Sequence, residues 1–355
     1  MSILMPVVMK KRIAVIPGDG IGPEVIREAV KVMDAAGAPV ECISLDWGAD
    51  RYLRDGVAVP PDGFRTLSEN YDAILVGAFG DPRVPDNRHA ANILLGMRFQ
   101  MDLYANVRPA RLLDRRLCPL RDATENDVNF VVVRENTEGL YANMGGNFKK
   151  GTADEVATQE DVNTRKGVER VIRYAYEYAR ARGIKRVCMG DKANVLTYGH
   201  GLWQRVFAEV RQEYPDIESR HLYADVLAME MVLRPASFGV IVTCNMFGDI
   251  LTDLAAALEG GLGMVPSGNI HPGRVSMFEP VHGSAPPLAG KNVANPVGAI
   301  RTAAMMLEHL GLADAARRID DAVLASVRER QCTADVGGKL GTREVGDWIA
   351  ARAKS

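Results

Sequence analysis

The best candidates for holding a metal ion are two aspartates, which lie in the segment NMFGDILTD. Asp249 and Asp253 are four residues apart, so they share one face if the segment is helical. Two carboxylates on one face repel each other and destabilise the helix unless a cation lies between them. Hard ions such as Mg²⁺ and Mn²⁺ prefer carboxylate oxygens. A solvated acidic face is the alternative, but the neighbours Ile250, Leu251 and Leu254 are apolar, which favours a metal site bordering a packed surface.

Arginines near predicted strand ends form a second candidate group, suited to binding carboxylates. Arg98 and Arg108 flank the segment 99–107, and Arg134 opens RENTEGLY directly after a short apolar run. A guanidinium can form two parallel hydrogen bonds to one carboxylate, so arginines in these places would suit a diacid substrate. Taken singly, each of them is more commonly part of a surface salt bridge.

A lysine and a tyrosine are candidates for proton transfer. Lys192 follows a predicted strand at 186–189, at the carboxyl edge where α/β sheets place their ligands. Desolvation or neighbouring cations lower the pKa of a lysine enough for it to act as a base, and Tyr141 is a candidate partner acid. By residue type alone, both would be called structural.

Two loops are candidates for contacting a nucleotide. The turn GDGIG at 18–22 stands between a predicted strand and a helix, where a phosphate cradle would lie. Its spacing differs from the G-x-G-x-x-G of dinucleotide-binding folds, so an ordinary Rossmann fold is disfavoured and a purely structural turn is the alternative. The loop EPVHGSAP at 279–286 offers His282 and backbone amides for an adenosine or ribose, although His282 could equally be a hydrogen-bonded loop residue.

The elements that must position these residues alternate between short apolar strands and amphipathic helices, which predicts an α/β fold with a largely parallel sheet. Strands are predicted at 12–17, 40–45, 73–77, 130–133, 186–189, 221–224 and 240–243. Helices are predicted at 23–36, 64–70, 165–182, 202–213, 226–233, 297–310 and 313–330, with a mainly helical pattern after residue 268. The Gly- and Asn-rich segment 140–161 predicts either a hairpin arm that pairs with a second subunit or a plain surface loop.

Composition is that of an ordinary soluble globular protein, and 355 residues are enough for two or three lobes. The 43 basic and 45 acidic side chains nearly balance, which argues against a nucleic-acid partner and against a membrane surface. The five cysteines are odd in number and form no C-x-x-C pair, which indicates a reducing compartment. Because the apolar run at 1–10 is too short for a secretory leader, we expect a cytoplasmic location.

Taken together, these segments resemble the β-decarboxylating dehydrogenases, which form the isocitrate and isopropylmalate dehydrogenase family. The resemblance runs from about Ile13 to the C-terminus and rests on motifs in this order: IPGDGIGPEV, DLYANVRPA, VVRENTEGLY, DKANVL, NMFGDILTD and FEPVHGSAP. It implies a two-lobed α/β fold with a mixed, largely parallel sheet that is not a Rossmann fold. A cofactor-binding lobe would combine residues 1–106 and 262–355. The central lobe, 107–261, would carry the metal site, the dimer interface and an arm at about 140–161.

The resemblance also implies a role for each candidate residue. The carboxylates of a malate-type substrate would be held by Arg98, Arg108 and Arg134. The ligands of Mg²⁺ or Mn²⁺ would be Asp249 and Asp253, together with Asp225 of a second subunit. Lys192, also from that neighbour, would assist removal of the hydroxyl proton, and Tyr141 would protonate the enol carbon after CO₂ leaves. The nicotinamide cofactor would lie along His282, Gly283, Ser284, Ala285 and Asn295. The expected assembly is a homodimer with shared active sites.

One departure from the family pattern concerns the cofactor. Family members that prefer NAD commonly have an acidic residue after HGSAP, where this chain has Pro287 followed by Leu288. The Lys-Tyr pair by which NADP-preferring isocitrate dehydrogenases read the 2′-phosphate is also absent. NAD is therefore the expected cofactor.

The residues just before Arg98 bear on the substrate. Isocitrate enzymes carry Ser and Asn there, whereas this chain has Leu94 and Leu95, which match an apolar pocket for an isopropyl group. The resemblance thus implies NAD-dependent oxidative decarboxylation of 3-isopropylmalate to 2-oxoisocaproate, the leucine biosynthesis type of reaction. D-malate, tartrate or another 3-alkylmalate are the alternative substrates. A non-catalytic dinucleotide- or diacid-binding protein is the alternative from a different class.

Overall fold

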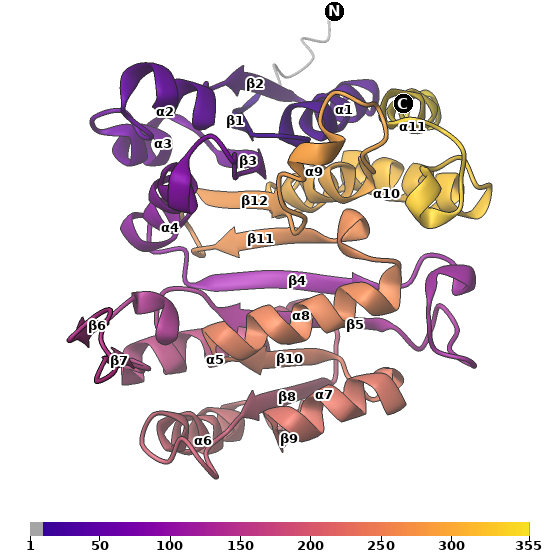
Figure 1. Cartoon of the computed structure of the whole chain (residues 1–355). Helices are drawn as coiled ribbons and strands as arrows, with labels where there is room; N and C mark the ends of the chain where they lie inside the picture. The colour runs from indigo at the N-terminus through magenta and orange to yellow at the C-terminus, as the bar shows by residue number, and fades with distance from the viewer. Residues whose placement is uncertain (1–9, 355) are drawn as a thin grey trace, which may run out of the picture. The chain divides into compact units, whose positions relative to one another are not determined.

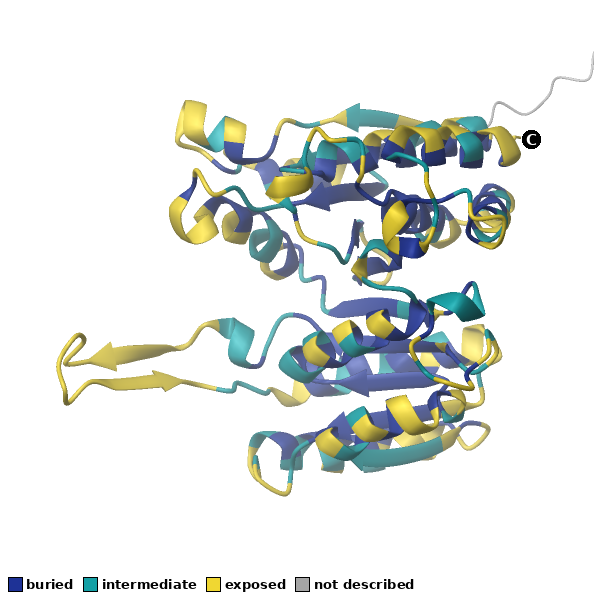
Figure 2. Ribbon diagram, turned by 45° about the vertical axis from the view of Figure 1, so that its right-hand side comes forward, coloured by how far each residue is buried: buried dark blue, intermediate teal, exposed yellow. Residues whose placement is uncertain are grey.

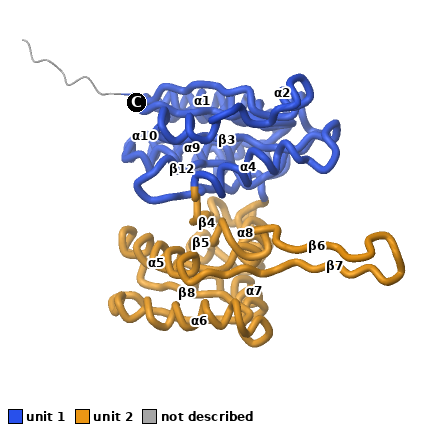
Figure 3. Tube along the Cα trace, turned by 90° about the vertical axis from the view of Figure 1, so that its left-hand side faces the viewer, with its two compact units in different colours: residues 1–101, 262–355 blue, residues 102–261 orange. Residues whose placement is uncertain are grey.

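The computed structural model describes residues 10–354, and the chain divides into two compact units. Unit 1 comprises Met1–Met101 and Leu262–Ser355, and unit 2 comprises Asp102–Gly261 (Figure 3). The sequence predicted lobe boundaries after residues 106 and 261, whereas the units of the structure divide after Met101 and Gly261. The apolar run at the N-terminus lies outside the described residues, except for Lys10. In the described part of the chain, no helix is both long and apolar enough to cross a membrane.

The sheet of unit 1 has the strand order β2-β1-β3-β12-β11 (Figure 1). These strands are β1 (Lys11–Gly18), β2 (Val40–Ser44), β3 (Ala73–Ala78), β11 (Pro266–Ile270) and β12 (Ser276–Pro280). β1, β2, β3 and β12 are parallel, and β11 is antiparallel to β12. The residues of β3 are all buried, as expected of a continuous apolar strand that is covered on both faces.

The longer helices of unit 1 pack against one another, and the first two of them also contact this sheet. They are α1 (Gly22–Ala35), α9 (Val297–His309), α10 (Ala313–Arg328) and α11 (Thr342–Arg352). The remaining helices are α2 (Ala49–Asp55), α3 (Gly63–Asn70) and α4 (Arg88–Gln100). Most residues of α9 are buried, because α9 is apolar around most of its circumference and contacts α1, α10 and the sheet.

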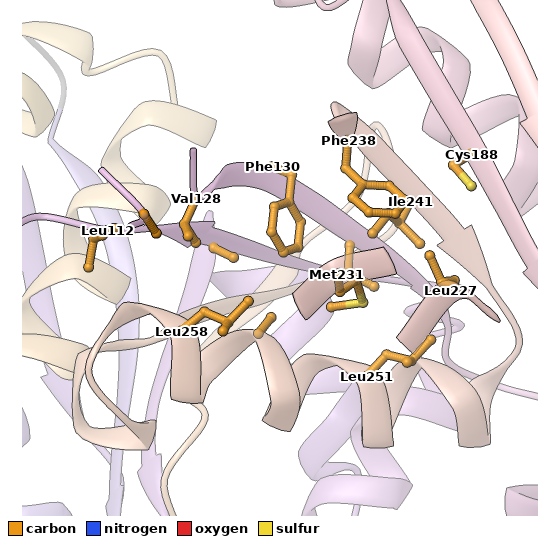
Figure 4. Close-up of a cluster of buried hydrophobic side chains, with 14 of the residues drawn as sticks. Leu112, Val128, Phe130, Cys188, Leu227, Met231, Phe238, Ile241, Leu251 and Leu258 are labelled. Atoms are coloured by element: carbon orange, nitrogen blue, oxygen red, sulfur yellow. The ribbon is translucent and has the colours of Figure 1, made fainter. Parts of the chain in front are cut away.

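The sheet of unit 2 has the strand order β4-β5-β10-β8-β9, in which only β4 is antiparallel to its neighbour. Its strands are β4 (Ala105–Arg111), β5 (Asn129–Glu135), β8 (Arg186–Asp191), β9 (Glu218–Tyr223) and β10 (Val240–Thr243). Its helices are α5 (Arg165–Ala181), α6 (Gly199–Val210), α7 (Ala224–Leu233) and α8 (Asn245–Glu259). The buried face of α8 contributes Leu251 and Leu258 to a cluster with Phe130 and Ile241 (Figure 4). Each such side chain contributes about 1.5–3 kcal/mol to stability when fully buried.

The segment at 140–161 contains an antiparallel hairpin of β6 (Gly145–Phe148) and β7 (Val156–Gln159). All residues of both strands are exposed, including the apolar side chains of Phe148 and Val156 (Figure 2). An isolated two-stranded hairpin is marginally stable in water. A hairpin with exposed apolar side chains is typical of an element that another chain covers.

The structure confirms the α/β class and the mixed, largely parallel sheet, and every predicted strand and helix is present, most with shifted ends. The expectation of a mainly helical chain after residue 268 was wrong for β11 and β12. The sequence of β11, PSGNI, contains residues that are rare in strands. It forms a strand because antiparallel pairing with β12 satisfies its backbone, and because the side chain of Asn269 donates to Glu279 (2.9 Å) inside the sheet.

Candidate active site

Asp249 is the centre of a charged cluster on α8. Arg134 donates to its carboxylate from Nη1, and Nη2 of Arg108 lies 3.5 Å from Asp249 Oδ1. The hydroxyl of Tyr141 donates to Asp249 Oδ2 at 2.7 Å. The arginine guanidiniums are buried, whereas the Asp249 side chain is 41% exposed. The cluster thus presents one carboxylate, two cations and a phenol at the surface of unit 2.

The pairing of β4 with β5 explains why both arginines reach α8. In this antiparallel register Arg134 lies opposite Asn106 and Arg108 lies opposite Val132. Side chains alternate along a strand, so Arg108 and Arg134 are diagonal neighbours on one face of the sheet. α8 crosses that face, and Asp249 is reached from both strands.

Asn245, in the first turn of α8, holds Arg134 in place. Its Oδ1 accepts from Arg134 Nε (3.0 Å) and Nη2 (2.6 Å), while its Nδ2 donates to the carbonyl of Glu138 (3.1 Å). Gly248 provides the space, because a Cβ there would lie 2.5 Å from Arg134 Cγ. Sequence reasoning missed both roles, although Asn245 opens the motif NMFGDILTD and stands one turn before Asp249.

Gly248→Ala is therefore expected to displace Arg134 and to lower the free energy of unfolding by about 1–3 kcal/mol through overpacking. The displaced atoms are Cβ and Cγ of Arg134, which cannot move without the backbone or the guanidinium moving too. Chemical denaturation would measure the stability. Gly201→Ala on α6 is the matched control, because its Cβ would meet only Arg205 Nη1, at 3.5 Å. Equal stability of the two variants would contradict the packing argument.

The predicted metal-binding aspartates occupy two helices of unit 2. Asp249 and Asp253 lie one turn apart on α8, which confirms the predicted helix, and Asp253 is exposed. Asp225 lies in the first turn of α7 and is exposed, with Lys192 Nζ 2.6 Å from its Oδ1. The hydrogen bond from Lys192 holds the pKa of Asp225 below its usual value. The negative charge of Asp249 is offset by Arg134 and Arg108, so the helix does not depend on a metal to relieve repulsion between the aspartates.

Within residues 10–354 of one chain, no three His, Cys, Asp or Glu side chains converge into a group that could hold a metal. Asp249 and Asp253 supply two carboxylates on one face of α8, and Asp225 stands beside Lys192 instead. Among the described residues of one chain, the three predicted ligands therefore do not form one metal-binding group.

Lys192 lies directly after β8, at the carboxyl end of that strand, as predicted. Its backbone N–H donates to His200 Nδ1 (2.9 Å), and the next amide, of Ala193, donates to the buried carboxylate of Asp191 (2.8 Å). These bonds fix the backbone at Lys192 and leave its side chain partly exposed beside Asp225.

Tyr141 follows β5 in a short 3₁₀ turn, and its ring lies under the Arg134 guanidinium at 5.0 Å. Burial, followed by the neighbouring Asp249 carboxylate, raises the pKa of Tyr141 above its ordinary value. The phenol therefore keeps its proton at neutral pH, which is the state that a proton donor requires.

The third predicted substrate arginine, Arg98, belongs to unit 1. It lies near the end of α4, where its Nη2 donates to Glu279 Oε1 at 3.1 Å. Its Nε is buried and has no hydrogen-bond partner among the described residues. Leu94 and Leu95, on the same helix, are half-buried. Glu279, which stands in FEPVHGSAP, was missed as the partner of Arg98.

The predicted cofactor loop follows β12 and packs on the glycine turn. Ser284 accepts from the Ile21 amide through its carbonyl (2.8 Å), and a Cβ at Gly20 would lie 2.0 Å from that oxygen. The Asp19 amide donates to the carbonyl of Ala78 (2.6 Å). These contacts favour the structural interpretation of the GDGIG turn: its glycines permit close backbone approach, and its amides at 19 and 21 bond to protein carbonyls.

The polar side-chain atoms of His282 and Asn295 differ in whether they form hydrogen bonds within the protein. His282 Nε2 is buried without a hydrogen-bond partner in the described chain, and burial lowers the pKa of this side chain, so it stays neutral. Asn295 Oδ1 accepts from the amide of Val297 at the start of α9 (3.0 Å), and its Nδ2 donates to Asp335 (3.0 Å). His282 therefore has a free nitrogen for a ligand, whereas Asn295 already bonds to the protein through both amide atoms.

Both family models and individual proteins similar to this chain are known. A model of the isocitrate/isopropylmalate dehydrogenases matches residues 12–349. The chain belongs to this family. The 3-isopropylmalate dehydrogenase of Thermobifida fusca is 49% identical over 348 residues, which cover 96% of this chain and 97% of that protein. The protein of the same name from Mycobacterium tuberculosis H37Rv is 48% identical over 342 residues, which cover 96% and 99%.

Among solved structures, the isocitrate dehydrogenase from Methylococcus capsulatus matches with a TM-score of 0.89 at 40% identity, over 97% of this chain and 100% of that one. The family assignment made from the motifs is thereby confirmed, as is the family's α/β fold. By family the chain is a dehydrogenase. The roles of its individual site residues remain predictions.

Proposed function

We propose that the chain catalyses the NAD-dependent oxidative decarboxylation of a 2-hydroxy diacid, and that this diacid is 3-isopropylmalate, as in leucine biosynthesis. The observation that carries the proposal is the cluster of Arg108, Arg134, Tyr141 and Asp249 in unit 2. It combines cations that suit a carboxylate with a protonated phenol and a carboxylate that can bind a metal. The names of the relatives described above support the substrate.

The residues present fit a divalent metal ion. Asp249 and Asp253 offer hard carboxylate oxygens on one helix face, and Asp225 of a second subunit is the proposed third ligand. This all-oxygen donor set suits Mg²⁺ or Mn²⁺ rather than softer metals.

The residues present also fit a nicotinamide dinucleotide in unit 1. The buried Nε2 of His282 lacks a partner in the described chain, and the loop from Gly283 to Ala285 follows the carboxyl end of β12. Pro287 and Leu288 are exposed in the next turn, and neither can accept from a ribose hydroxyl or bind a 2′-phosphate through its side chain. Because this turn offers no positively charged side chain to bind the 2′-phosphate of NADP, NAD is the proposed cofactor.

The proposed reaction assigns a task to each cluster. When bound, the divalent ion supplies positive charge where the enolate oxygen develops, and NAD accepts the hydride from C2. Lys192 assists removal of the hydroxyl proton as the ketone forms. Arg108 and Arg134, with Arg98, hold the carboxylates. The C–C bond to the leaving carboxylate then breaks and CO₂ leaves. The electron pair of that bond forms the enolate, and Tyr141 delivers a proton to its carbon.

We further propose a homodimer in which unit 2 forms the interface. α7 and α8 expose large apolar side chains, with Met229 at 51%, Leu233 at 65% and Ile250 at 60% exposure. Exposed apolar side chains of this kind mark surfaces that bind another protein. A second copy is the proposed occupant, because in the described part of one chain Asp225 does not converge with Asp249 and Asp253, and because the hairpin is exposed. Five free cysteines support the proposed cytoplasmic location.

The test is the substrate profile. We expect kcat/KM for 3-isopropylmalate with NAD to exceed that for D-malate and tartrate by at least about tenfold, since each buried methylene is worth about 1–3 kcal/mol in an apolar pocket. Each substrate should be assayed with both NAD and NADP. Turnover of D-malate at an equal or higher kcat/KM would make the 3-isopropylmalate assignment wrong. The absence of turnover with every diacid would favour a non-catalytic binding protein.

A further inference from the structure

A buried pair of hydrogen-bonded side chains in unit 1 takes no part in the proposed chemistry. Asp19 lies in the glycine turn after β1, and His89 lies in the first turn of α4. His89 Nε2 is 2.8 Å from Asp19 Oδ2, and the side chains are 0% and 4% exposed. Neither residue was singled out in the sequence, because they stand 70 positions apart.

The carboxylate of Asp19 joins the loops that follow three neighbouring strands. Its Oδ1 accepts from the Ala49 amide (2.7 Å), after β2, and its Oδ2 accepts from the Gly80 amide (2.9 Å), after β3. β2, β1 and β3 are parallel, so these loops meet at one carboxyl edge of the sheet. This is the edge at which α/β sheets bind their ligands.

His89 anchors the start of α4 to that carboxylate. α4 begins after Asp86 and Asn87, which both have left-handed backbone conformations (φ 58° and 49°). The side chain of Asn87, at the N-cap, accepts from the Asp81 amide (3.1 Å) rather than from the helix. The ring of His89 also stacks on Tyr52 of α2, with centroids 6.0 Å apart. A fully buried side chain therefore connects this end of α4 to the sheet edge.

The other end of α4 is held by the pair of Arg98 and Glu279. Between the two anchors lie Leu94 and Leu95, and a helix rises about 1.5 Å per residue as a stiff rod. Loss of the anchor at His89 would therefore let α4 tilt about the Arg98 end, which displaces Leu94 and Leu95.

We propose that Asp19 and His89 are positioning residues, which set α4 and its substrate contacts relative to the glycine turn. The same turn supports the proposed cofactor loop, through the bond from the Ile21 amide to the Ser284 carbonyl (2.8 Å). The Asp19 carboxylate thus connects α4, which carries the proposed substrate contacts, to the glycine turn, which supports the proposed cofactor loop. The inference rests on the proposed roles of Leu94, Leu95 and Arg98.

The test compares two variants of similar size. His89→Met removes the donor to Asp19, whereas His89→Gln keeps an N–H that can reach it. We expect His89→Met to raise KM for 3-isopropylmalate by about tenfold with a much smaller change in kcat, because the helix is displaced but the reacting groups remain. His89→Gln should restore most of the affinity.

Ile319→Ala in α10 is the stability control, because Ile319 is fully buried in the same unit and lies on another helix. It should lower the melting temperature and leave KM unchanged. If His89→Met behaves in the same way, the pair is purely structural and the inference is wrong.

Hydrogen exchange of the α4 amides gives a readout that does not need turnover. It should be faster in His89→Met than in His89→Gln, with α10 unchanged. If α4 exchanges equally in both variants, the anchoring role is refuted, whichever substrate the enzyme uses. If no diacid is turned over but α4 still responds, the proposed function fails and the anchor stands.

Discussion

Replacing Asp249 with Asn is expected to reduce kcat/KM by roughly 10²- to 10³-fold or more, the size of effect seen when one charge-stabilising group is removed from a transition state. Asn has nearly the same shape, and its Oδ1 can still accept from Arg134, while its Nδ2 can donate to the Tyr141 hydroxyl, so the fold should be kept. What is lost is the negative charge that the proposed metal ion needs. Steady-state kinetics over a range of Mn²⁺ concentrations, together with Mn²⁺ binding by calorimetry, would measure both effects.

Asp216→Asn is the matched control for this variant. Asp216 also lies in unit 2, is 46% exposed and pairs with Arg180 at 2.8 Å, so its exposure and its arginine partner resemble those of Asp249. It should retain full activity and full affinity for Mn²⁺. Wild-type metal affinity in Asp249→Asn would show that this carboxylate is not a ligand, whatever its effect on rate.

Replacing Lys192 with Ala is expected to lower kcat by about 10²- to 10⁴-fold, which is the range for loss of a general acid or base, with a smaller change in KM. The reason is that Lys192 Nζ is the amine that stands beside the proposed metal ligand Asp225. Lys185→Ala is the control, because Lys185 is also in unit 2, is 69% exposed and lies 4.0 Å from Asp216. A wild-type kcat in Lys192→Ala would show that Lys192 does not assist proton removal.

Mixing the two inactive variants tests whether active sites are shared between subunits. If Lys192 of one subunit serves the Asp249 cluster of the other, a mixed dimer of Lys192→Ala and Asp249→Asn contains one intact site. Random exchange makes half of the dimers mixed, so activity should recover to about a quarter of the wild-type value. Recovery would support the dimer, whereas a mixture as inactive as its parts would show that both residues act within one chain.

Much of this molecule was predictable from local sequence, because its strands and helices have strong periodic patterns. The apolar runs of β1, β3, β5 and β10 and the amphipathic helices were recognised, and α8 confirmed that Asp249 and Asp253 share a helix. β11 was not predicted, because a strand of Pro, Ser, Gly and Asn exists only through its pairing with β12. The ordered motifs were sufficient to place the chain in its family, since each motif keeps its residue types and spacing in the linear sequence.

By itself, the sequence determined which residue types stand at the ends of which elements, and hence the class of chemistry. Only the tertiary structure decided which of them meet. Asp249 and Arg134 are 115 positions apart, and Asp19 and His89 are 70 apart. The first contact depends on the packing of α8 on β5, and the second on the order β2-β1-β3, which gathers the loops around Asp19. The physical reason is that local patterns arise from neighbours along the chain, whereas strand order and register are set by packing over the whole sheet.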